Sequence, residues 1–172
     1  MLSTVTGNLP LGEHESTVDV WSYTASVEYI KGDYTFAYEY MVMFFKLGFG
    51  EYTPPDPDFS TLAYYGSVSY RLSELMEFYL CYSMHYDDRN DRDGSELEGI
   101  DYKYRRWIEE YIFSVRFNLN ENWILKLETH INDGAAVLLN KDQNAPEIID
   151  GRERYPYKKN WMLYAVKLSF SF

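Results

Sequence analysis

Apolar and polar residues alternate with a period of two along most of this chain. The clearest case is the last segment, Asn160 to Phe172, in which every second residue is large and apolar: Met162, Tyr164, Val166, Leu168, Phe170 and Phe172. The residues between them are mostly small or polar, such as Ala165, Lys167 and Ser169. Because successive side chains of a strand point to opposite faces, this segment predicts a strand with one continuously apolar face.

The same alternation predicts seven strands. They span about Asp19–Ile30, Tyr34–Gly48, Thr61–Leu72, Met76–Tyr86, Trp107–Leu119, Trp123–Asn132 and Asn160–Phe172. Tight turns at 31–32, 73–74 and 120–122 alternate with long loops at 49–59, 87–106 and 133–159. Residues 1–17 lack the alternation, so we expect them to form a loop or a partial segment.

This pattern is typical of an antiparallel transmembrane β-barrel, so the predicted fold class is all-β. Barrel strands turn an apolar face to lipid and a polar face to the lumen, and their short periplasmic turns alternate with long extracellular loops. Most of the predicted strands have ten or more residues, which is enough to cross a bilayer at a tilt. No uninterrupted apolar run approaches the about 18 residues that a membrane helix needs.

An odd number of strands does not fit a complete barrel of this kind. Most bacterial single-chain barrels have an even strand count, and an open edge in lipid leaves backbone groups unpaired. The start of the chain also lacks the basic residues and apolar core of a signal peptide, although an outer-membrane protein must be exported. We therefore expect residues 1–172 to be a single domain that forms the carboxy-terminal portion of a larger barrel.

Five apolar residues fall on the predicted lumen face: Met43, Phe45, Ile108, Ile112 and Leu163. Bulges, a partly apolar interior or errors in the predicted register would each account for them. The sequence leaves these three explanations open.

Four segments carry a resemblance to a known family: Ser26–Tyr40, Tyr70–Phe78, Asn122–Glu128 with the following Asp133-Gly134, and Asn160–Phe172. Together they resemble the carboxy-terminal half of bacterial outer-membrane porins of the phosphate-selective porin type and its relatives, over about residues 20–172. The resemblance implies upstream strands, an outer-membrane location and a homotrimer, because such porins are many-stranded and often trimeric. The implied partners are outer-membrane lipid and the barrel-assembly machinery, which would contact the strand that ends at Phe172.

The chain carries a formal net charge of −11. This charge argues against a nucleic-acid partner, since that affinity depends on Lys and Arg meeting phosphate. Acidic residues concentrate between Asp87 and Asp101, which is typical of a solvated loop. When Gly94 is aligned with the EF-hand glycine, Arg89 and Ile100 occupy ligand positions that need carboxylates, so no specific calcium site is predicted. Looser binding of divalent cations by this loop is left open.

The faces that alternate with the apolar ones are expected to line water, and their charged residues are the candidate pore-lining groups: Glu39, Arg71, Glu77, Glu110, Arg116, Lys126, Glu128 and Lys167. Hairpin geometry predicts that Arg71 lies opposite Glu77 and that Arg116 lies near Lys126. Rings of charge set ion preference in pores. The alternative is that these residues form salt bridges within the wall, each worth about 1 kcal/mol or less.

Aromatic residues make up 19% of the chain and include 18 Tyr. Those near the predicted strand ends are candidates for membrane-interface girdles, where a ring is half wet: Tyr29, Tyr34, Trp107, Trp123, Phe170 and Phe172. Ordinary packing within a β-sheet is the alternative interpretation.

The sequence predicts no enzyme, no cofactor and no metal site. It contains none of the GxSxG, HExxH, CxxC or phosphate-binding loop motifs. His85 and His130 fall in the lumen phase, where a lipid-cleaving Ser–His pair would not reach its substrate. Cys81 is the single cysteine, which excludes an intrachain disulfide, and its neighbours Leu80 and Tyr82 indicate a wall residue.

The sequence therefore predicts an outer-membrane porin, a passive channel for small hydrophilic solutes or ions. Two alternatives remain. One is a non-conducting structural or adhesive barrel, whose lumen would be filled by bulky residues such as Met41, Met43 and Phe45. The other is a soluble, lipocalin-like binder, whose apolar face would point inward.

Overall fold

The computed structural model describes residues 2–11, 14–49, 58–97, 103–136, 147–149, 152–154 and 158–171. Its elements are β1 (Leu2–Leu11), β2 (His14–Lys31), β3 (Tyr34–Phe49), β4 (Asp58–Arg71), β5 (Met76–Tyr86), the 3-10 helix η1 (Lys103–Arg106), β6 (Trp107–Asn118), β7 (Trp123–Gly134), β8 (Glu147–Ile149), β9 (Arg152–Arg154) and β10 (Asn160–Phe170). Eight strands form one sheet in the order β1-β2-β3-β4-β5-β6-β7-β10, and every pairing in it is antiparallel. β8 and β9 form a separate hairpin.

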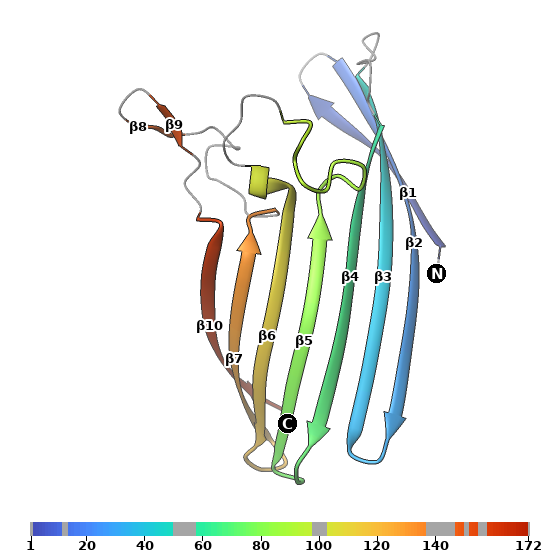
Figure 1. The fold of residues 1–172 in the computed structure, drawn as a ribbon. Coiled ribbons are helices and arrows are strands. Elements are labelled where there is room, and N and C mark those ends of the chain that lie inside the picture. Colours follow the sequence, from blue (N-terminus) through green and yellow to red (C-terminus); the bar gives the residue numbers. More distant parts are fainter. Residues whose placement is uncertain are drawn as a thin grey trace.

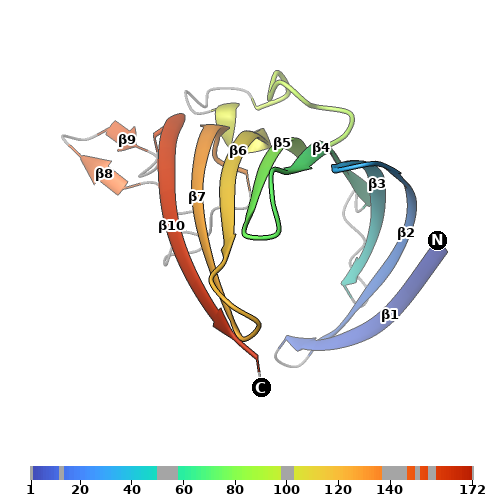
Figure 2. The same cartoon turned by 90° about the horizontal axis from the view of Figure 1, so that it is seen from below.

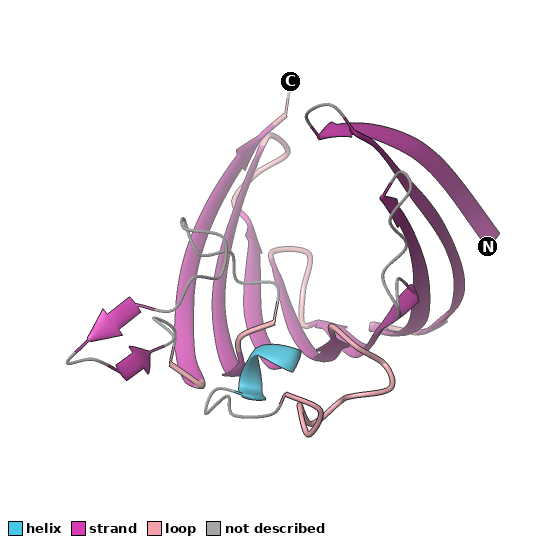
Figure 3. Cartoon of the chain, turned by 90° about the horizontal axis from the view of Figure 1, so that it is seen from above, coloured by secondary structure: helices cyan, strands magenta, loops and turns pink. Residues whose placement is uncertain are grey.

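The large sheet curls into an incomplete barrel (Figure 1). Viewed along the strands, it is an arc with β1 at one edge and β10 at the other (Figure 2 and Figure 3). Within the described residues β1 pairs only with β2 and β10 only with β7, so the sheet is not closed. The predicted all-β, antiparallel, barrel-like fold is confirmed, and the open sheet fits the expectation that the chain is part of a larger barrel.

The seven strands predicted from the alternation are all present, as β2 to β7 and β10. The bounds of β5 agree with the prediction, and the other strands differ by a few residues at their ends. The turn between β2 and β3 places Gly32 at a φ of 59°, which is the left-handed conformation that short hairpins require and that glycine adopts without strain.

Residues 1–17, for which the sequence predicts a loop or a partial segment, instead contain β1 and the first residues of β2. The local sequence hides β1 because Gly7 and Pro10 interrupt it and its apolar residues do not alternate cleanly. Pairing with β2 along the whole of β1 defines the strand. A proline is tolerated there because β1 lies at the edge of the sheet.

Two small elements lie in segments for which the sequence predicts only loops. The β8–β9 hairpin lies within the loop before β10, and η1 precedes β6. No helix in the described part of the chain is long and apolar enough to cross a membrane.

The two faces of the sheet differ in chemistry. The pairing brings the alternate, mostly apolar residues of every strand, here called the apolar phase, to the same side of the sheet. Within this phase Val42 lies beside Leu62 and Leu62 lies beside Tyr86. This apolar phase occupies the convex side, because the segment after β5 lies outside the arc (Figure 2) and its Arg89 and Arg92 lie over Phe44 and Tyr86 of this phase. Large side chains of the phase are strongly exposed, for example Phe113 at 51%. The next residue, Ser114, belongs to the concave side and is 4% exposed.

The concave face also carries the five apolar residues noted above, Met43, Phe45, Ile108, Ile112 and Leu163. The pairing around them runs residue by residue without a bulge, and they keep the predicted phase. A partly apolar concave face is therefore the explanation that holds.

Candidate functional site

Five of the predicted pore-lining residues lie in one row across the concave face. In order from β4 to β10, directly paired residues are Arg71, Glu77, Arg116, Lys126 and Lys167. The predicted opposition of Arg71 and Glu77 and the predicted closeness of Arg116 to Lys126 are both confirmed. Short turns fix the pairing of Arg71 with Glu77 and of Arg116 with Lys126, because turn type and loop length set the register of a hairpin. The other two pairings join strands that long loops connect. We call these five residues the basic row.

The basic row holds more positive than negative charge. Four of its five members are cations. Two carboxylates partly offset their charge: Glu77 within the row and Glu128 beside it, whose Oε1 lies 2.8 Å from Lys126 Nζ. Lys126 Nζ also lies 5.6 Å from the centroid of the Tyr79 ring. The row borders a hollow of about 260 Å³ on the concave face. Like charges that lie directly opposite each other repel, so this surface favours an anion over a cation.

The remaining predicted pore-lining residues, Glu39 and Glu110, lie in a second row nearer the long loops. Its members from β3 to β7 are Glu39, Tyr65, Ser83, Glu110 and Asn132. Glu110 lies six residues before Arg116 on the same strand, roughly 20 Å away along its axis. Positive and negative charge are therefore separated along the concave face.

Glu110 is the centre of a polar cluster in this second row. Its Oε1 lies 2.7 Å from His130 Nδ1, and Ser83 Oγ donates to its Oε2 at 3.4 Å. The carboxylate thus lies between the hydroxyl and the imidazole, whereas nucleophilic catalysis requires the base beside the nucleophile. Asn132 is 2% exposed and neither atom of its amide has a hydrogen-bond partner.

The described residues of the acidic loop after β5 are held by hydrogen bonds within the loop and by an ion pair with η1. Asp91 is 1% exposed; its Oδ2 lies 3.3 Å from Arg106 Nε, and its Oδ1 accepts the N–H of Glu96 at 3.2 Å. Hydrogen bonds from the hydroxyl and the N–H of Ser95 lower the pKa of the Asp93 carboxyl. Within the described ranges, no group of three or more His, Cys, Asp or Glu side chains could hold a metal ion.

The predicted interface aromatics lie on the convex face, near the ends of their strands. Tyr29, Tyr34, Trp123 and Phe170 are at the end with the short turns, and Trp107 is at the end with the long loops. Tyr34 stacks on Tyr70 at 4.6 Å between centroids, and Trp123 lies 4.8 Å from Phe170. Phe172 lies outside the described residues. Placement is thus known for five of the six, while their role at a membrane interface stays a prediction.

Three further rings at the loop end were not singled out from the sequence: Trp21, Phe44 and Tyr86. Trp21 stacks on Phe44 at 5.3 Å between centroids. Tyr86 pairs with Trp107, whose indole N–H donates to Asp133 Oδ1 at 2.9 Å. Their position in the apolar phase of their strands is the sequence signal that could have identified them.

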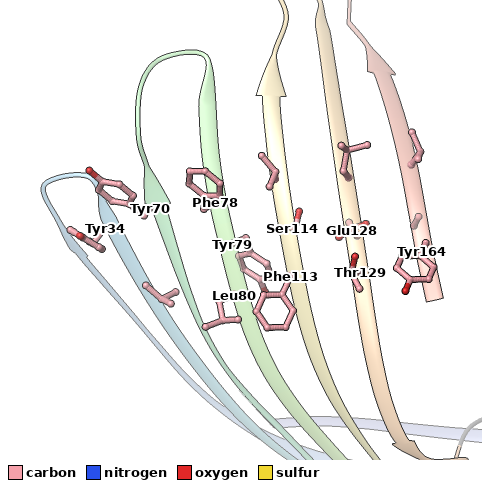
Figure 4. A pocket seen from close by; sticks show the side chains of 15 residues that line it. Tyr34, Tyr70, Phe78, Tyr79, Leu80, Phe113, Ser114, Glu128, Thr129 and Tyr164 are labelled. Carbon is pink, nitrogen blue, oxygen red and sulfur yellow. The ribbon is translucent and has the colours of Figure 1, made fainter. Parts of the chain in front are cut away.

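A shallow hollow of about 690 Å³ lies on the convex face, across the middle of the sheet. Figure 4 shows aromatic residues of its lining, which come from β5 and from strands on both sides of it: Tyr34, Tyr70, Phe78, Phe113 and Tyr164.

No protein-family model, no curated protein and no solved structure matches this chain. The resemblance to porins in the strand motifs therefore stays a hypothesis. The functional interpretation depends on the geometry of the two faces.

Proposed function

We propose that this chain forms part of the wall of an outer-membrane channel of the porin type. In this proposal the convex face contacts lipid hydrocarbon, and the concave face lines a water-filled pore for small hydrophilic solutes or ions. The main support is the apolar band that continues in register across β2 to β10 on the convex side. No bond is made or broken in passive diffusion of this kind.

Burial supports a lipid environment for the band. Among the described residues only Val42, Leu62, Cys81, Ala135 and Ala136 form a buried apolar core, whereas 25 large hydrophobic side chains are exposed. Of these, 19 belong to the band; the other six are Ile30, Phe59 and Leu163 on the concave face and Leu72, Leu75 and Leu119 in the turns. An exposed apolar surface of that extent is unfavourable in water and marks an interaction site. Lipid covers the whole band without requiring a complementary protein surface.

The height of the band matches a bilayer. On β10 the apolar phase spans the nine residues from Met162 to Phe170, and a tilted transmembrane strand needs about 9–11 residues. The apolar band of outer-membrane barrels is about 25 Å tall, and aromatic girdles border it at both ends. The rings at the two ends of the sheet fit these girdle positions.

The open edges fit this proposal if further strands complete the barrel. In hydrocarbon every backbone N–H and C=O needs a partner, so β1 and β10 cannot both remain free. Additional strands of a larger barrel would supply these partners. The soluble, lipocalin-like alternative is less well supported, because its rings would turn to the concave side.

A non-conducting barrel is the second candidate. Phe45 and Phe59 stack at 4.6 Å between centroids on the concave face near the long loops, and Met41 and Met43 lie on the same face. These bulky groups narrow the space that a solute could use. Conductance separates this candidate from an open channel.

The test is conductance of the full-length natural protein, purified in detergent and added to planar bilayers. A channel gives stepwise current increases, and a heat-denatured sample gives none. Folded protein without current would favour the non-conducting barrel. Protein that stays dispersed and folded in buffer without detergent would rule out both membrane proposals.

A further inference from the structure

The segment that follows β5, residues 87–97, folds back over the convex face. Figure 2 places it outside the curve of the sheet. The N–H of Arg89 donates to the carbonyl of Ser60 at 2.7 Å, which fixes one side of the segment to β4. The buried Asp91 pairs with Arg106, which fixes the other side to η1. The segment therefore has a defined position against the loop end of the apolar band.

Two arginines of this segment lie over rings of the convex face. The guanidinium carbon of Arg89 is 5.5 Å from the centroid of Phe44, and that of Arg92 is 5.5 Å from the centroid of Tyr86. A guanidinium group stacked on a ring still presents N–H donors at its edge. Both arginines can therefore bind an anion without leaving the rings.

Four of the five carboxylates of the same segment, all except that of Glu96, are engaged by other groups. Asp91 pairs with Arg106, and three more bind donors within two residues: Asp87 with His85, Asp88 with Asn90 and Asp93 with Ser95. No carboxylate within the described ranges forms an ion pair with Arg89 or Arg92. Among the described residues of this acidic loop, neither arginine has a carboxylate partner.

We infer that Arg89 and Arg92 bind the phosphate groups of anionic lipid headgroups. This inference depends on the proposed function, which places the rim of the apolar band at the depth of the headgroups. Guanidinium groups match phosphate oxygens in geometry and charge. No cation of the described residues lies over a ring at the short-turn end of the convex face. The arginine contacts therefore favour the leaflet on the side of the long loops.

The test compares lipid binding by the full-length protein and three variants. The protein is reconstituted in vesicles of phosphatidylcholine mixed with phosphatidylglycerol of the same acyl chains, and the lipids retained after purification are counted by native mass spectrometry. We expect each arginine to contribute about a fivefold preference for the anionic lipid. Arg89→Gln or Arg92→Gln should therefore reduce this preference about fivefold, and the double variant should reduce it roughly thirtyfold. Arg89→Lys retains most of the preference, which separates loss of charge from loss of folding.

Lys103→Gln is the matched control, because it removes one positive charge from η1 at the same end of the molecule, and none of the cation–ring contacts of the described residues involves Lys103. The inference is supported if Lys103→Gln retains the preference that the arginine variants lose. It is overturned if the natural protein retains both lipids equally, or if Lys103→Gln loses as much as Arg89→Gln. If the natural protein inserts into neither lipid, the proposed function is wrong, and the headgroup inference falls with it.

Discussion

Lys126 Nζ lies 2.8 Å from Glu128 Oε1, two residues further along the same face of β7. The neighbours of Lys126 across the sheet are both cations, Arg116 on β6 and Lys167 on β10. The contact along the strand therefore offsets repulsion that the cross-strand pairing creates. In the proposed channel, Glu128 would therefore control how much of the positive charge of the basic row acts on a passing ion.

Replacing Glu128 by Gln should shift the ion preference of the channel toward anions. The change removes the carboxylate nearest Lys126 and is worth about 0.5–1 kcal/mol near a wet surface, which is roughly two- to fivefold in the permeability ratio. Lys167→Gln should shift it the other way. The measurement is the reversal potential in a salt gradient, with the exposed Lys158→Gln as a control. Equal reversal potentials for all variants would show that the basic row does not line the ion pathway.

An arginine on the convex face should destabilise the inserted protein, whereas one on the concave face should not. Leu127 is 41% exposed on the convex side near the middle of β7, and Ile124 belongs to the concave side of the same strand. Leu127→Arg should cost about 2–4 kcal/mol in a bilayer. Urea unfolding in vesicles measures the difference, and Ile124→Arg should stay within about 1 kcal/mol of the natural protein. The opposite order would reverse the assignment of the faces.

The contact between Glu110 and His130 should stabilise the pairing of β6 with β7. The two side chains are only partly exposed and lie 2.7 Å apart, so a coupling free energy of about 1 kcal/mol is expected. A double-mutant cycle with Glu110→Gln and His130→Gln measures it by chemical unfolding in detergent. A coupling near zero would show that the two side chains act independently.

Breaking the pair between Asp91 and Arg106 should loosen the loop after β5 without affecting the barrel. Asp91→Ala leaves a partly buried guanidinium group without its carboxylate, which costs about 1–3 kcal/mol locally. Cleavage by trypsin after Arg89 or Arg92 should therefore become roughly tenfold faster or more. The migration of the unheated, folded protein on gels should stay the same. Asp88→Ala is the control, since Asp88 holds only the N–H of Asn90. Equal cleavage rates would contradict the anchoring role.

Gly134→Ala should be far more damaging than Gly66→Ala. Gly134 has a φ of 98°, and a Cβ there would lie 2.2 Å from the carbonyl oxygen of Trp107. A Cβ at Gly66 would meet only Tyr38 Cδ2 at 3.8 Å, an ordinary contact. The expected loss for Gly134→Ala is about 2 kcal/mol or more, against less than about 1 kcal/mol for Gly66→Ala. Unfolding by denaturant in detergent would show whether this order holds.

The hairpins were predictable because their information is local. Alternation identifies the strands, a tight turn such as that at Gly32 fixes the register, and one apolar phase decides which residues share a face. The opposition of Arg71 to Glu77 follows from these rules alone and is confirmed. Placement of Glu39 and Glu110 on one face follows in the same way.

The sequence could not reveal what depends on contacts between distant segments. β1 exists because β2 offers it a free edge, and residues 87–97 lie on the convex face because Ser60 and Arg106 hold them there. Neither interaction leaves a periodic signal in the chain.

The sequence by itself determined seven of the strands, β2 to β7 and β10, together with their two faces and the chemistry of each face, because each of these segments alternates with a period of two. Only the tertiary structure decided that Glu77 pairs with Arg116 and Lys126 with Lys167, which joins the charges into one row, and where the described part of the acidic loop lies. The physical reason is that the lateral alignment of hairpins joined by long loops, and the curvature of the sheet, arise from pairing and packing over the whole sheet rather than from any one segment.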